Sequence, residues 1–85
     1  MSEQSVDALV EHAVAVANNI LQGGTDPYRG AKRLWAMEVA LAPLEEDLRV
    51  FAGLASEWED APNHRDAYER DIVAAADRFR ARWGR

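Results

Sequence analysis

Few side chains in this sequence have the types and the spacing that metal binding requires. The two histidines, His12 and His64, lie far apart in the sequence. Neither belongs to an H-E-x-x-H or an E-x-x-H motif. Glu57 and Asp60 come shortly before His64, but Pro62 interrupts the helix that would have to place all three side chains on one face. The sequence therefore predicts no metal site, and we expect neither a metal nor another cofactor.

Nucleophilic catalysis has equally little support. Ser56 precedes Glu57 inside an expected helix, without the glycine elbow or the nearby histidine that would activate a serine. Ser2 and Ser5 stand at an expected helix start, where serine hydroxyls cap free backbone N–H groups. The chain has no cysteine, which removes both a thiol nucleophile and a disulfide. We therefore expect that the chain is not an enzyme by itself.

The size and the charge of the chain narrow its function further. Its 85 residues form one expected domain, 1–85, and folding at this size buries roughly 63% of the surface of the unfolded chain. Such a core leaves little room for a large enclosed pocket. The net charge of −5 disfavours nucleic acids and anionic membranes as partners. Without a signal peptide or a membrane-spanning apolar run, we expect a cytoplasmic protein.

Apolar residues recur with helical spacing in four segments, which predicts an all-α fold. The first segment should end before Gly23 and Gly24, and the second should begin with Asp26 as its N-cap and Pro27 as its first helical residue. The expected apolar faces comprise, in chain order, Val6, Leu9, Val10, Ala13, Ala17 and Ile20; Tyr28, Ala31, Leu34, Trp35, Val39 and Ala42; Leu44, Leu48, Phe51, Leu54, Ala55 and Trp58; and Tyr68, Ile72, Ala75, Ala76, Phe79 and Trp83.

Prolines separate the later segments. Pro43 disfavours α geometry at Ala42 and lacks a backbone donor, so we expect a break or kink there, with one long bent helix as the alternative. The third segment should end near Pro62, and Asn63 should cap the fourth. Short connections favour antiparallel neighbours. The sequence therefore predicts a small antiparallel bundle of three to four helices.

Three charged residues fall on apolar faces. At 100° per residue, Glu38, Asp47 and Arg65 each point along the apolar side of an expected helix. A buried unpaired charge is strongly destabilising, so each should be paired or should reach solvent at an end of the bundle. The alternative is a polar recognition spot within an apolar groove. For Glu38 we expect a shielded carboxylate bonded to Arg65, to Arg49 or to the Tyr28 hydroxyl.

Three tryptophans in so short a chain are unusual. Trp35 and Trp58 align with apolar faces, which favours a place in the core. Trp83 falls at the end of the last helix, where it could join Arg80 and Arg82 in a contact surface, because tryptophan and arginine are enriched in interfaces. The alternative is that Trp83 packs on the first helix of its own chain. The candidate interaction residues are Trp35, Glu38, Trp58, Arg80, Arg82 and Trp83.

Two stretches carry a resemblance to a known group of proteins. Residues 26–35, DPYRGAKRLW, are similar to the D-P-Y-x-G-A-x-x-[LI]-W pattern of small uncharacterised bacterial proteins. Residues 51–60, FAGLASEWED, resemble a second block of the same group. The resemblance covers most of the chain after Thr25. It implies a bacterial, cytosolic protein, and it implies no activity and no catalytic residue.

Together these features predict a helical module that binds a protein partner or a second copy of itself. In a homodimer, the aromatic faces of the later helices should meet, and Arg80 and Arg82 should lie opposite Glu57, Glu59 or Asp60 of the second copy. One alternative is an acidic inhibitor or immunity-type protein that covers a basic partner. The other is a non-catalytic subunit of a larger enzyme.

Overall fold

The computed structural model describes residues 6–84 and is all-α over this range, as predicted. The elements in chain order are α1 (Val6–Gln22), α2 (Pro27–Ala36), the 3-10 helix η1 (Ala42–Leu44), α3 (Glu45–Asp60), the 3-10 helix η2 (Pro62–His64) and α4 (Arg65–Trp83). None of the helices in the described range has both the length and the apolar character needed to cross a membrane.

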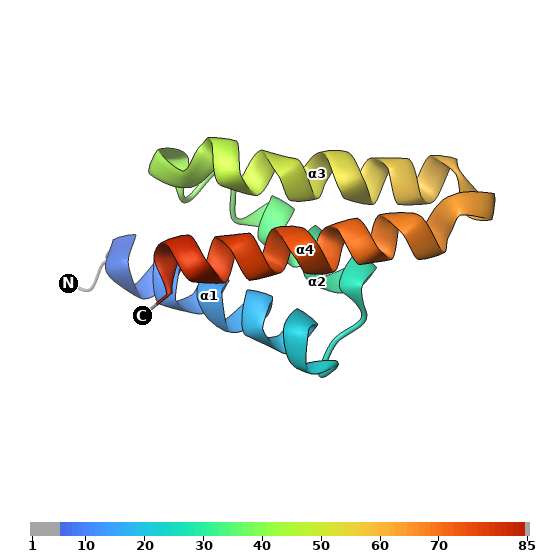
Figure 1. Ribbon diagram of the computed structural model, residues 1–85. Helices are drawn as coiled ribbons and strands as arrows, with labels where there is room; N and C mark the ends of the chain where they lie inside the picture. Colours follow the sequence, from blue (N-terminus) through green and yellow to red (C-terminus); the bar gives the residue numbers. More distant parts are fainter. Residues whose placement is uncertain (1–5, 85) are drawn as a thin grey trace.

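The four α-helices form a small bundle in which each helix packs on its neighbours along the chain. α1 contacts α2 and α4, and α3 also contacts α2 and α4, so α1 and α3 lie diagonally apart. Figure 1 shows α3 and α4 running side by side in opposite directions, with the short α2 behind them. The bundle therefore presents the long seam between α3 and α4 as part of its outer surface.

The core of the bundle is aliphatic with two phenylalanines. Leu34, Leu48 and Ile72 are completely buried, and none of the described polar or charged residues is. Phe51 of α3 meets Phe79 of α4 edge-on, with ring centroids 6.2 Å apart and planes at 82°. This contact between aromatic rings holds α3 against α4.

Local capping signals place the connection between α1 and α2. α1 ends at Gln22, and Gly23 follows with a φ of 78°, a left-handed conformation that favours glycine. Asp26 caps α2 by accepting a hydrogen bond from the backbone N–H of Arg29 at 3.2 Å, and Pro27 is the first helical residue. Both predicted boundaries are confirmed.

α2 ends earlier than its apolar pattern indicates. A turn over residues 37–41 follows it and leads into η1, so the interruption predicted at Pro43 is confirmed but starts several residues before the proline. Along this path Leu41 and Leu44 enter the core, with exposed fractions of 0% and 2%. Burial of these two leucines stabilises the turn. Leu44 was expected on the apolar face of the third segment, whereas the helical spacing did not place Leu41 in the core.

The short α2 also exposes residues that the periodicity assigned to a buried face. Trp35 is 37% exposed and Val39 is 92% exposed, and Ala42 is exposed as well. The prediction that Trp35 lies in the core is therefore wrong. The buried face of α2 is narrow and includes Ala31 and Leu34, so Trp35, turned 100° from Leu34, falls on its rim.

The start of α4 differs from the prediction by one residue. α3 ends at Asp60, close to Pro62 as expected, but η2 takes in Asn63 before α4 begins. His64 occupies the N-cap position and makes no side-chain cap. The prediction that Asn63 caps α4 is wrong because the turn that begins at Pro62 continues through it. Ser5, predicted to cap α1, lies outside the described residues.

Candidate functional site

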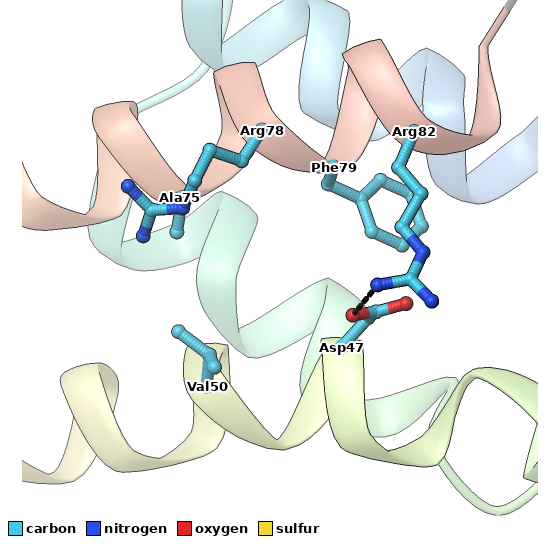
Figure 2. A pocket seen from close by; sticks show the side chains of 6 residues that line it. All are labelled: Asp47, Val50, Ala75, Arg78, Phe79 and Arg82. Carbon is cyan, nitrogen blue, oxygen red and sulfur yellow. Dashed lines mark ion pairs between the residues drawn. The ribbon is translucent and has the colours of Figure 1, made fainter.

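The seam between α3 and α4 is hollowed into a groove of about 290 Å³. Figure 2 shows the side chains that line it: Asp47 and Val50 from α3, and Ala75, Arg78, Phe79 and Arg82 from α4. The α4 members recur at i, i+3, i+4 and i+7, so a single helical stripe supplies them. Phe79 and Ala75 are buried, and Val50 is 44% exposed. The groove thus has an apolar floor that is open to solvent at Val50.

Two arginines one helical turn apart form the rim of this groove on α4. Arg82 lies 3.5 Å from a carboxylate oxygen of Asp47 across the groove, the ion pair drawn as a dashed line in Figure 2. Arg78 is exposed and forms no ion pair or hydrogen bond with any other described side chain. Because Asp47 offsets only one of the two guanidinium groups, the rim carries a net positive charge.

Asp47 also connects the groove to the end of α4. Its second carboxylate oxygen accepts a hydrogen bond from the indole N–H of Trp83 at 2.8 Å. Trp83 packs against the core as well, so both its ring and its polar atom are engaged within the chain. The alternative considered for Trp83 placed it on the first helix of its own chain, whereas the polar partner of the indole is Asp47 of α3.

The other charged candidates near this end are paired within the chain. Arg80 binds Asp77 on its own helix at 2.9 Å. Glu38 lies in the turn after α2, with a side chain that is only 20% exposed, and its carboxylate is 3.5 Å from Nε of Arg49. Arg49 also binds Glu45. The prediction that Glu38 is shielded and bonded is confirmed, with Arg49 as the partner.

Trp58 belongs to a separate aromatic cluster at the opposite end of the bundle. Tyr28 stacks on its ring, with centroids 4.0 Å apart and planes at 15°, and the guanidinium of Arg65 lies 3.8 Å from the same centroid. The indole N–H donates to Glu69 at 3.0 Å, and Nε of Arg65 donates to the Trp58 carbonyl at 3.1 Å. These contacts explain how Arg65 is accommodated on an apolar face: cation–π and hydrogen-bond partners stabilise its charge.

A hydrogen bond and an ion pair extend this cluster to Glu59. The Tyr28 hydroxyl donates to the Glu59 carboxylate, and the ammonium group of Lys32 lies 3.4 Å from it. The hydrogen bond from Tyr28 and, after it, the bond from Lys32 lower the pKa of Glu59. The same hydrogen bond raises the pKa of the Tyr28 hydroxyl.

Tyr28→Phe should therefore raise the pKa of Glu59 toward its ordinary value of 4.5. A pKa lowered by folding means that this carboxylate stabilises the fold above about pH 4.5 and stops doing so as the pH falls through the lowered pKa. Carboxyl ¹³C NMR titration measures the change directly. Tyr68→Phe is the matched control and should leave Glu59 unchanged, whereas an unchanged Glu59 in Tyr28→Phe would refute the hydrogen bond.

A second groove lies on the other flank of α4. It has a volume of about 420 Å³ and is lined by Pro27, Asp66, Glu69, Arg70 and Val73. Two carboxylates and one guanidinium give it the opposite charge to the α3/α4 groove. Val73, an apolar residue of this lining, is 36% exposed.

The predicted interaction residues do not gather at one site. Arg82 lines the α3/α4 groove, and Trp83 touches it through Asp47. Trp58 belongs to the far end of the bundle, and Trp35 lies on the exposed rim of α2 beside Lys32, whose ammonium is 5.6 Å from its ring centroid. The predicted set is thus spread over the molecule, and Glu38 and Arg80 belong to ion pairs of their own.

Sequence reasoning missed Val50 and Arg78. Their spacing gave a weak indication of a shared surface. Val50 follows Asp47, the acid on an apolar face, by three residues, and Arg78 precedes Arg82 by four. What the spacing cannot reveal is that these two stripes face each other, because that depends on how α3 packs on α4.

The α3/α4 groove combines charged and apolar side chains. It offers a carboxylate, two guanidinium groups and an apolar floor, without a hydroxyl, thiol or imidazole among its lining side chains. Within residues 6–84 there is no group of three or more His, Cys, Asp or Glu side chains that could hold a metal ion. Comparison with protein-family models, with curated proteins and with solved structures finds no match for this chain.

Proposed function

We propose that this chain is a protein-binding module and that the α3/α4 groove is its docking surface. The observation that carries this proposal is an open apolar floor beside Arg78, a guanidinium without an ion-pair partner among the described residues. An apolar side chain of a partner can bury against Val50 and Phe79 while a neighbouring carboxylate binds Arg78. We therefore expect the partner segment to carry an acidic residue next to an apolar one.

The open shape of the groove favours a protein over a small molecule. Small-molecule sites usually enclose about 300–1,000 Å³ and surround most of their ligand. This groove has about 290 Å³ and lies open along the seam of two helices, as Figure 2 shows. A shallow seam of this kind suits a side chain or a helix that belongs to a larger surface.

The second groove supports the alternative of an acidic inhibitor-type protein. Asp66 and Glu69 beside the half-exposed Val73 would suit a partner segment with a basic residue next to an apolar one. The net charge of −5 would speed the encounter with such a partner. Glu69 is already bonded to the indole of Trp58, which leaves Asp66 as the freer acid and makes this the weaker candidate.

Site-specific photocrosslinking in the native host separates the two grooves. A photoreactive phenylalanine analogue at position 50 should capture one protein, and the crosslinked peptide should carry Asp or Glu beside an apolar residue. The same analogue at position 73 is a matched control, because Val50 and Val73 are both partly exposed valines and each lines one of the two grooves. Equal capture at both positions, or capture at position 73 alone, would contradict the proposal.

A further inference from the structure

We propose that the partner of the α3/α4 groove is a second copy of this chain, which docks through a two-fold axis at right angles to α3 and α4. This inference rests on the proposed function and names its occupant. It depends on an α3/α4 face that extends the groove along the seam. We define this face by six residues: Val50, Leu54 and Glu57 on α3, and Asp71, Ala75 and Arg78 on α4.

Helical spacing places these residues on the same side as the groove. On α3, Leu54 and Glu57 follow Val50 at i+4 and i+7, and on α4 the same spacing leads from Asp71 to Ala75 and Arg78, so each set forms one stripe. Val50, Ala75 and Arg78 line the groove itself, which orients both stripes toward it.

The α3/α4 face changes charge from one end to the other. Because α3 and α4 are antiparallel, Arg78 lies near Val50 at one end, whereas Glu57 and Asp71 lie toward the other. Glu57, Asp71 and Arg78 are exposed, and none of them forms an ion pair with another described residue. The half-buried Leu54 supplies apolar surface between the charged ends, and the exposed Val50 adds apolar surface beside Arg78.

This distribution of charge is complementary to itself. A two-fold axis that crosses the helices at right angles reverses the direction of the second copy, so Arg78 of each copy meets Asp71 of the other. Glu57 adds negative charge near the same arginine. A two-fold axis parallel to the helices would instead bring the two positive ends together and the two negative ends together, which like-charge repulsion disfavours.

The proposed contact differs from the homodimer predicted from the sequence. Arg80 and Arg82 were expected to bind acids of a second copy, but their partners are Asp77 and Asp47 of their own chain. Trp83 is likewise engaged by Asp47. On the α3/α4 face, the charged groups left for a second copy are therefore Glu57, Asp71 and Arg78.

Charge reversal tests this pairing. In sedimentation equilibrium at low salt, the wild type should be a dimer. Asp71→Arg and Arg78→Asp should each raise the dimer dissociation constant by roughly tenfold or more, because each creates two like-charge contacts per dimer. The double variant Asp71→Arg/Arg78→Asp restores opposite charges across the axis, and its dissociation constant should return close to that of the wild type. Circular dichroism of each variant verifies that the helices remain intact.

Arg70→Asp is the matched control, since Arg70 is an exposed arginine of α4 that lines the other groove, and it should leave the dissociation constant unchanged. A wild type that stays monomeric at about 1 mM overturns the inference, as does a double variant no better than the single ones. If a monomeric wild type still captures another protein from position 50, the docking groove stands and only the second copy is excluded. A monomer that captures nothing from that position refutes both proposals.

Discussion

Replacing Phe51 with alanine is expected to lower the free energy of unfolding by about 3–5 kcal/mol. Phe51 is 1% exposed and meets Phe79 edge-on, so the substitution removes buried apolar surface and leaves a cavity between α3 and α4. Urea denaturation followed by circular dichroism measures the loss. Val50→Ala is the neighbouring control on the same helix, and its 44% exposure predicts a change of about 1 kcal/mol or less. A loss below about 1 kcal/mol for Phe51→Ala would contradict the packing described for the core.

The size of this effect bears on the proposed function as well. Domains of this kind have total stabilities of about 5–15 kcal/mol, so a loss of 3–5 kcal/mol is a large share. Phe51 and Phe79 hold together the two helices that form the groove. Loss of binding in Phe51→Ala would therefore report unfolding rather than docking, which is why the docking tests use Val50, Asp71 and Arg78 on the surface.

Replacing Gly30 with alanine is expected to lower the free energy of unfolding by about 1–3 kcal/mol, even though alanine is the better helix former. A Cβ atom at Gly30 would overlap Cγ1 of Ile20 and would lie 2.6 Å from its Cδ1. Ile20 is 3% exposed and has little room to move away. The absence of a side chain at Gly30 is what allows α1 and α2 to approach each other here.

Gly53→Ala is the matched control for this prediction. Gly53 lies within α3, and a Cβ atom added there would meet no heavy atom within 4 Å other than those of its chain neighbours and its own helix backbone. Alanine should therefore stabilise the protein by about 0.5–1 kcal/mol through its helix propensity alone. Thermal denaturation at low protein concentration should show opposite shifts for the two substitutions. A stabilising Gly30→Ala would mean that α1 and α2 are further apart than described.

Short-range chemistry determined much of the fold from the sequence by itself. The end of α1 at Gly23 and the start of α2 at Asp26 and Pro27 follow from backbone conformations and caps within a few residues. The cost of burying charge also predicted that Asp47 and Glu38 would be paired or would reach solvent, and both are paired. Such predictions succeed because burying an unpaired charge is unfavourable in any tertiary context.

Only the tertiary structure decided which residues meet. Asp47 and Trp83 are 36 residues apart and still form a hydrogen bond. Val50 and Arg78 share a groove because α3 packs antiparallel on α4 around the two phenylalanines. Trp35 lies on the surface because α2 ends early and a turn brings Leu41 into the core. Helical periodicity gives the direction of a side chain around its own helix, whereas the neighbour it meets depends on long-range packing, which no local pattern encodes.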